Sequence, residues 1–249
     1  MNNIFEVWQN FNKQQSSLKG PMAQEWMNKI NQSSKIWASE SYPKGEYWKY
    51  LKFGDLSQTK LQPALAQGGN SIEVSKNRID IQINDFSGLT EFKPINLPEG
   101  LKIYSHQEAM ESDELTQKLL SMIKKSPEEN KLSEVNYSFM GLGLFIEVAD
   151  KKIVDQEIYI SFDLNSLSAK DVFAPFSTQI LVGEQSQATV FVEVKSDNFA
   201  GFSNIRFDAT VKKAAQLNMY SKEKVELSLA PCSIILWTLK EMRFSTFSI

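Results

Sequence analysis

Short segments in which apolar and polar residues alternate fill the second half of the chain, from residue 136 to residue 249. Alternation with a period of two residues predicts half-buried β-strands. The segments are Leu142–Val148, Ile153–Phe162, Ile180–Val182, Val190–Val194, Ile205–Val211, Leu217–Met219, Val225–Leu229 and the stretch 234–249. They are not separated by helical stretches of the dozen or more residues that doubly wound α/β folds need as crossovers. A sandwich, a barrel or a solenoid is therefore expected, and the periodicity does not choose among them, since no strict repeat is visible.

The first 60 residues carry a different, helical pattern with many aromatic side chains. Apolar residues at helical spacing mark two segments, with Ile4, Phe5, Trp8 and Phe11 in one and Trp26, Ile30 and Trp37 in the other. Gly20-Pro21 lies between them, which predicts two separate helices. Core packing is the expected role of the tryptophans.

Residues 61–135 mix both patterns. Ser71–Val74 and Arg78–Ile83 alternate, which predicts two strands joined by a turn. Leu97–Gly100 predicts a second turn, followed by a short strand. Ser105 with Glu108 three residues later forms the pattern of a capping box, so two short helices are expected to begin there.

The composition excludes several classes of protein. The 249 residues are 42% hydrophobic, which is enough for a sizeable core. A formal net charge of −3 is of the wrong sign for neutralising many phosphates, so no nucleic acid partner is expected. No basic run and no long apolar run occurs, so no membrane contact is expected either. The N-terminus does not have the pattern of a secretory signal, and a cytoplasmic location is the expectation.

Four segments share residues with motifs of one known family. They are Glu46-Tyr47-Trp48-Lys49-Tyr50, then Leu97–Ile103 with Glu108-Ala109, then Leu132–Phe139 running into Gly143–Val148, and Ile180–Val190. In this order and spacing they resemble the SufB/SufD family of iron–sulfur cluster assembly scaffold proteins, and its SufD branch most. Ala149 departs from the family pattern, which has proline there, and Gln185-Ser186 replaces a glycine turn.

The resemblance implies a mainly β fold of the α+β class. It would consist of an N-terminal helical and mixed α/β region over residues 1–135 and a right-handed parallel β-helix over residues 136–249. Stacked coils of such a solenoid bury their inward-pointing aliphatic and aromatic side chains against one another. Arg243–Ile249 resembles a strand part-way through the family's solenoid, so the chain is expected to be a short form without the family's C-terminal part.

The function that the resemblance implies is that of a non-catalytic scaffold subunit in iron–sulfur cluster biogenesis. Its partners would be a SufB-like subunit and a SufC-like ATPase, although the family contacts SufC through the C-terminal part that this chain is expected to lack. The open end of a short solenoid also predicts a homodimer, or a partner that covers this end. No catalytic residue is expected, and a cluster would be bound only at an interface with a partner.

Cys232 and His106 are the only cysteine and the only histidine. A buried, inert thiol is the expected state of Cys232, with cluster ligation or sulfur acceptance as the alternative, because thiolate is the form such chemistry requires. Clusters usually need four protein ligands, so one thiol needs ligands from another chain. His106 stands beside the predicted helix start without a second candidate ligand, which favours a structural or solvent-facing role over metal binding.

Two other functions remain as alternatives to the scaffold. One is a structural or binding β-solenoid without a cluster role. The other is a carbohydrate-active β-helix, which would need calcium-binding carboxylates and a basic residue on one face, and Asp150, Lys151, Asp155 and Asp163 are the candidates. No phosphate-binding loop with a following Lys-Ser/Thr occurs. The carboxylate pairs Asp113-Glu114 and Glu128-Glu129 are expected to be solvated charges at helix starts.

Overall fold

The computed structural model describes residues 4–15, 23–38, 62–64, 69–86, 96–122, 131–167, 172–197, 199, 201–224 and 242–245. It is a mixed α/β structure in which sheets dominate. The helices are α1 (Ile4–Gln15), α2 (Ala23–Ala38), α4 (His106–Met110), α5 (Asp113–Met122) and α6 (Lys131–Ser138), with a 3₁₀ turn η2 (Leu164–Ser166). The strands are β1 (Gln62–Pro63), β2 (Ser71–Val74), β3 (Arg78–Ile83), β4 (Leu101–Ser105), β5 (Gly143–Val148), β6 (Glu157–Asp163), β7 (Val172–Val182), β8 (Gln187–Lys195), β9 (Gly201–Val211), β10 (Gln216–Lys224) and β11 (Met242–Ser245).

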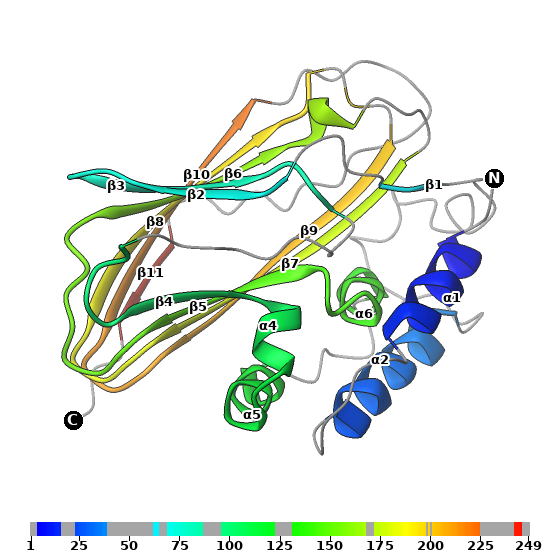
Figure 1. Ribbon diagram of the computed structural model, residues 1–249, viewed down its shortest axis with the longest axis horizontal. Coiled ribbons are helices and arrows are strands. Elements are labelled where there is room, and N and C mark those ends of the chain that lie inside the picture. Colours follow the sequence, from blue (N-terminus) through cyan, green and yellow to red (C-terminus); the bar gives the residue numbers. More distant parts are fainter. Residues whose placement is uncertain are drawn as a thin grey trace.

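The strands form two sheets (Figure 1). Sheet 1 contains β4, β5, β7 and β9, with the short β1 beside the start of β7. Sheet 2 has the order β11-β10-β8-β6-β3-β2. The strands β2, β3 and β4, which precede residue 135, lie in these same two sheets.

From β5 to β10 the chain passes from one sheet to the other at every strand. In sheet 1, β7 pairs in parallel with β5 and with β9. In sheet 2, β8 pairs in parallel with β6 and with β10. Three successive turns of the chain, which we call rungs, are therefore stacked in parallel register.

Apolar side chains from both sheets fill the space between them. The apolar residues of β7 that point inward are at most 2% exposed, and they are Val172, Ala174, Phe176, Ile180 and Val182. Phe162 of β6 lies among them, with ring centroids 5.3 Å from Phe176. Each fully buried side chain of this size stabilises the fold by roughly 1.5–3 kcal/mol. The stacked rungs therefore share one continuous core.

A second apolar cluster covers the outer face of sheet 1. Phe145, Phe173 and Phe202, which point outward from the strands of sheet 1, pack with Trp26 of α2 and Phe139 after α6. Figure 1 shows the helices gathered on this side of the molecule. Every residue of β7 is consequently buried. Burial on both faces explains why the sequence before Ile180 lacks the alternation that marks the other strands.

Pro175 stands in the middle of β7, although proline cannot donate a backbone hydrogen bond. On one side of β7, β1 pairs with Val172 and Phe173, and β5 pairs only from Ser177 onward. Pro175 falls in the interval between these two partners. Neither β1 nor β5 therefore pairs with β7 at Pro175, the residue that has no backbone N–H to donate to a neighbouring strand.

Three corner turns with left-handed residues are stacked where the chain leaves sheet 1. Lys151, Gln185 and Ala214 have φ angles of 60°, 57° and 55°. The backbone N–H of Lys151 donates to the carbonyl of Glu184 at 2.7 Å, and that of Gln185 donates to the carbonyl of Lys213 at 3.0 Å. The sequence has no glycine at these three positions, so each turn holds a side-chain-bearing residue in a conformation that favours glycine.

Replacing Ala214 by glycine is expected to stabilise the protein. The left-handed conformation costs an alanine about 1–2 kcal/mol, and the added freedom of glycine in the unfolded chain costs about 0.4–1 kcal/mol, so a net gain of about 0.5 kcal/mol remains. Urea unfolding of the Ala214→Gly variant measures this gain. The matched control is Ala215→Gly at the next position, which is buried and outside the positive-φ region, and which is expected to lose stability. Equal losses in both variants would contradict the argument.

Most local expectations from the sequence are confirmed. The two N-terminal helices are α1 and α2, and β2 pairs antiparallel with β3 around residues 75–77. Ser105 caps α4 with a complete capping box involving Glu108. The end of the chain differs from the expected parallel rung, because β11 pairs antiparallel with β10. The expected features at residues 42–50, 126–129 and 225–232 lie outside the described residues.

Candidate functional site

A chain of buried polar side chains lies between the helices and sheet 1. His106, the first residue of α4, is completely buried, and its Nε2 lies 2.5 Å from Oε1 of Gln179 on β7. The amide Nε2 of Gln179 donates to Oγ of Ser177 at 2.7 Å and to Oδ2 of Asp208 on β9 at 3.2 Å. We call the chain from His106 through Gln179 and Asp208 to Arg206 and Tyr137 the polar relay. It connects two helices with two neighbouring strands of sheet 1.

The relay begins at a histidine with almost no free space around it. The Trp26 ring meets the His106 ring edge-on, with centroids 6.0 Å apart, and Nδ1 of His106 accepts from the N–H of Gly141 at 3.4 Å. A Cβ added at Gly143 would lie 2.1 Å from Cε1 of His106. Burial lowers the pKa of His106 to about 4, and the hydrogen bond with Gln179 opposes this only in part. The ring is therefore neutral at pH 7.

An ion pair forms the other end of the relay. Arg206 and Asp208 are two positions apart in β9, so both side chains lie on its outward side. Nη2 of Arg206 lies 2.7 Å from Oδ1 of Asp208. The Arg206 guanidinium also lies over the Tyr137 ring of α6, 4.4 Å from its centroid. Burial alone would lower the pKa of Arg206, but the hydrogen bond and charge of Asp208 outweigh this and raise it. Burial raises the pKa of Tyr137, so its hydroxyl remains neutral. Arg206 is therefore the charged partner of Asp208.

Asn136 of α6 ties this helix to the backbone of two rungs. Its Nδ2 donates to the carbonyl of Phe176 at 3.1 Å and to the carbonyl of Asn204 at 2.7 Å. Trp8 of α1 donates from Nε1 to the carbonyl of Ser138 at 3.1 Å, which fixes the end of α6. These bonds, with the relay, hold the helical layer at one position on the sheet.

The relay has the chemistry of a structural network. Its histidine is neutral and enclosed, and its carboxylate is paired with Arg206, so neither is poised to activate a substrate. Among the described residues, no group of three or more His, Cys, Asp or Glu side chains could hold a metal ion. Buried polar networks whose members are satisfied specify one packing arrangement. We conclude that the relay sets the register between the helices and the rungs.

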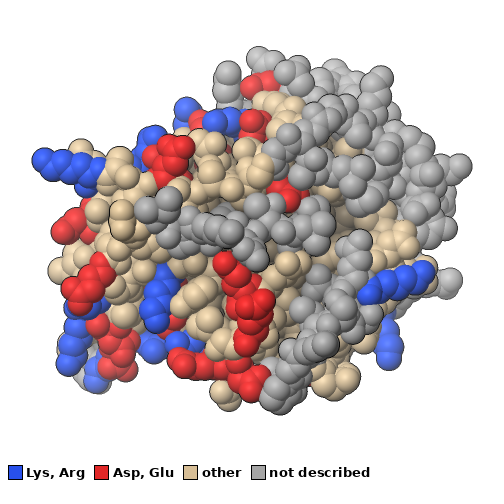
Figure 2. Space-filling model, in the orientation of Figure 1, with Lys and Arg blue, Asp and Glu red and all other residues tan. Residues whose placement is uncertain are grey.

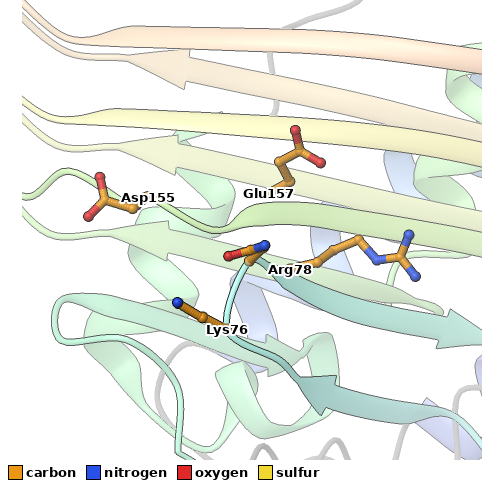
Figure 3. A pocket seen from close by; sticks show the side chains of 5 residues that line it. Lys76, Arg78, Asp155 and Glu157 are labelled. Carbon is orange, nitrogen blue, oxygen red and sulfur yellow. The ribbon is translucent and has the colours of Figure 1, made fainter.

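A surface hollow lies beside the turn between β2 and β3. Lys76, Asn77 and Arg78 line it on one side, and Asp155 and Glu157 line it on the other. Figure 3 shows that the labelled charged groups point in different directions rather than toward a common point. All five residues are exposed, and the N–H of Glu157 donates to the carbonyl of Asn77 at 3.0 Å. Such solvated charges do not form a preorganised site.

The carboxylates considered for calcium binding do not come together. Asp150 lies at a corner turn, where it accepts from the N–H of Glu184 at 2.8 Å and lies 3.7 Å from Nζ of Lys212. Asp155 lines the hollow before β6, whereas Asp163 at the far end of β6 caps η2. Asp113 and Glu114 are exposed in the first turn of α5, as expected. Cys232 and the pair Glu128-Glu129 lie outside the described residues.

The outward face of sheet 2 carries a second set of paired side chains. The Tyr159 hydroxyl of β6 donates to Oε2 of Glu193 on β8 at 2.8 Å, and Nζ of Lys222 on β10 lies 3.1 Å from the other oxygen. Phe191 and Tyr220 stack at 4.8 Å between neighbouring rungs. Burial and the bond to Glu193 raise the pKa of Tyr159 to about 12, and this bond also lowers the pKa of Glu193. These contacts join outward side chains of β6, β8 and β10, the strands that pair in parallel in sheet 2.

The sequence had indicated His106 but not the residues that it meets. Gln179, Asp208 and Arg206 lie 73 or more positions further along the chain. In β9 the signal is that Arg206 and Asp208 alternate with apolar residues, whereas in β7 Gln179 belongs to a run of consecutive polar residues, Ser177-Thr178-Gln179, that gives no alternation. Such positions normally face solvent, and only the helical cover turns them into a buried network.

Charge on the visible surface is mixed. In Figure 2, acidic side chains gather over α4 and α5, and both signs occur among the corner turns. No helix in the described part of the chain is long and apolar enough to cross a membrane. Comparison with protein-family models, with curated proteins and with solved structures finds no match.

Proposed function

We propose that this protein is a non-catalytic scaffold subunit of an iron–sulfur cluster assembly system, similar to the SufB/SufD family. Its stacked rungs would be a right-handed parallel β-helix, and its partners would be a SufB-like subunit and a SufC-like ATPase. The observation that carries the proposal is the alternation of β5 to β10 between two sheets with parallel pairing throughout. Parallel pairing of this kind supports the stacked coils that the family resemblance implies, although β11 departs from them by pairing antiparallel with β10.

The family-like segments coincide with positions where the fold depends on particular residues. Gly100, in the segment Leu97–Ile103, adopts a φ of 85° immediately before β4. Asn136, in the segment Leu132–Phe139, donates to the carbonyls of two rungs. Gln185 replaces the glycine of the family's turn and adopts the left-handed conformation that glycine favours. These coincidences support the resemblance independently of the order of the motifs.

The polar groups of the described core support a scaffold role rather than catalysis. His106, Asp208 and Arg206 are used within the relay, where they fix the helices on sheet 1. Sheet faces and edges of a rigid stack are the kind of surface on which a partner protein can dock. Under this proposal, Cys232 could ligate a cluster only together with ligands from a partner, because one thiol does not complete a cluster site.

Co-purification tests the proposal. The chain is co-expressed with SufB-like and SufC-like proteins from the same source, and a complex of defined stoichiometry is expected on size-exclusion chromatography. Gly143→Ala is the matched control, because its Cβ would lie 2.1 Å from His106 and 2.3 Å from the Ser177 carbonyl oxygen, so it disturbs the fold without changing the surface. Failure of the native chain to associate, or equal association of the control, would overturn the proposal.

A further inference from the structure

The helices α1 and α2 lie outside α6 on the helical side of sheet 1 (Figure 1), and we call these two helices the outer pair. Nδ2 of Asn12 donates to Oδ1 of Asn31 at 3.4 Å, which joins the two helices. Phe11 of α1 contacts Phe139 after α6, with ring centroids 5.4 Å apart. Trp26 of α2 is completely buried. The outer pair is therefore one layer that closes the second apolar cluster.

The contact between the outer pair and α6 buries polar atoms that are not paired. Nε1 of Trp26, Oγ of Ser33 and Oε2 of Glu134 have no hydrogen-bond partner in the part of the chain that the structure describes. The three residues are 0%, 0% and 2% exposed, so bulk solvent does not reach them. Such an atom loses its hydrogen bonds to water on burial and gains none in return. Each of them offsets part of the stability that the neighbouring apolar side chains contribute.

Ser33 and Glu134 lie on the sides of α2 and α6 that face each other. Ser33 follows Trp26 by seven positions and Lys29 by four, so these three residues share one side of α2. Glu134 precedes Tyr137 by three positions and shares its side of α6. Nζ of Lys29 lies 5.3 Å from the centroid of the Tyr137 ring, which brings the two sides together. The unpaired atoms therefore belong to the contact between the two helices.

Glu134 is the least favourable of the three residues in this contact. Its charge acts on Arg206 and Tyr137, but Arg206 forms its close ion pair with Asp208, at 2.7 Å. A carboxylate oxygen that is buried without a hydrogen bond loses more solvation than a hydroxyl does. Movement of α2 away from α6 would return this oxygen to water.

We propose that the outer pair opens from α6 as a unit while α4, α6 and the stacked rungs remain folded. Opening hydrates the polar atoms of Trp26, Ser33 and Glu134, which opposes the loss of apolar contacts. The open state then requires less free energy than complete unfolding, as local openings in proteins do. The polar relay stays closed, because its bonds join α4 and α6 to β7 and β9 and include no residue of the outer pair.

Opening would expose an aromatic row on the outer face of sheet 1. The ring of Phe139 lies 4.9 Å from that of Phe173, which stacks on Phe202 at 5.5 Å. In the closed state Phe11 lies at the end of this row, so the outer pair is its own occupant of the face. The outer pair therefore controls access to the face. The inference rests on this packing and does not depend on the proposed role in cluster assembly.

Native-state hydrogen exchange of the full chain tests the opening. Amides of α1 and α2 are expected to exchange together, about 100-fold faster than those of β6 and β8 after correction for intrinsic rates. Their exchange is expected to depend little on urea, because opening exposes only part of the surface that unfolding exposes. Amides of α6 are expected to exchange more slowly than those of the outer pair. Exchange of α1 and α2 at the rate and urea dependence of β6 and β8, or at rates that differ between α1 and α2, would overturn the proposal.

Two neighbouring serines of α2 provide matched variants. Ser33→Ala removes an unpaired hydroxyl from the closed state and is expected to slow exchange in α2 by about tenfold. Ser34 is also buried, but its Oγ donates to the carbonyl of Asn31 at 2.9 Å. Both substitutions raise helix propensity equally, so Ser34→Ala is expected to leave exchange unchanged or to speed it. Equal slowing by both variants would overturn the role of the unpaired atom.

Glu134→Gln tests the buried carboxylate from the other side of the contact. The amide keeps the shape of the side chain and removes its charge, so exchange in α1 and α2 is expected to slow by about tenfold. Glu111→Gln, at an exposed position after α4, is the control and is expected to change nothing. Faster exchange in Glu134→Gln would show that the carboxylate holds the outer pair closed, and would overturn the proposal.

Discussion

Acidification from pH 6.5 to pH 4 is expected to lower the free energy of unfolding by about 3 kcal/mol through His106 alone. Burial lowers the pKa of this histidine from 6.5 to about 4 in the folded protein, so the folded state resists the proton that the unfolded state takes up. The stability is fully present above pH 6.5 and is lost as the pH falls toward 4. Urea unfolding at several pH values measures the loss.

The protein is well suited to this measurement because His106 is its only histidine. Its imidazole resonances in NMR report the titration directly, and they are expected to remain those of the neutral ring until about pH 4. His106→Gln provides the control, since it keeps a polar side chain without a group that titrates in this range. The unfolding free energy of this variant is expected to depend less on pH between 6.5 and 4. A native titration midpoint near 6.5 would contradict the burial argument.

Asp208→Asn is expected to destabilise the protein by about 3 kcal/mol, because it leaves the largely buried Arg206 without its counter-charge. The side chains of Asp208 and Arg206 are 11% and 23% exposed, so water compensates only in part. The asparagine retains an oxygen that can accept from Gln179, and the substitution therefore isolates the effect of the charge. Denaturant unfolding at neutral pH gives the change in free energy.

The double variant Arg206→Met with Asp208→Leu separates charge from packing. Replacing both members of a buried ion pair by apolar side chains is often neutral, so most of the loss in Asp208→Asn is expected to be recovered. A loss below about 1 kcal/mol in Asp208→Asn would mean that the pair behaves as a surface ion pair. It would also mean that the relay contributes little to the position of α6.

The sequence predicts local structure where a single face of an element is buried. The alternation in Arg78–Ile83 and the capping box at Ser105 needed only neighbouring residues, and both expectations are confirmed. The start of β7 was not predicted, because its two buried faces remove the alternation and Pro175 argues against a strand. The antiparallel direction of β11 was not predicted either, because residue pattern alone does not give strand direction.

The candidate site was predictable only in part, and for a similar reason. His106 could be singled out as the only histidine, but its contacts depend on the rungs that bring Gln179 and Asp208 beneath α4 and α6. A contact between residues that are 73 positions apart is determined by topology rather than by local pattern. The family resemblance supplied the expectation of a β-helix over residues 136–249, and what the structure describes there is parallel pairing of β5 to β10 within two sheets.

The parallel stacking also determines where the chain can change in length. Val148 pairs with Val182, and Val182 pairs with Val211, so one rung takes 34 positions and the next takes 29. Both rungs nevertheless keep their registers, so the extra residues lie in the connections between strands. An insertion within β7 or β8 would instead turn inward side chains outward over the rest of the strand. Connections such as residues 149–156 are therefore where sequences of this kind can diverge, whereas the strands accept substitutions but not shifts in length.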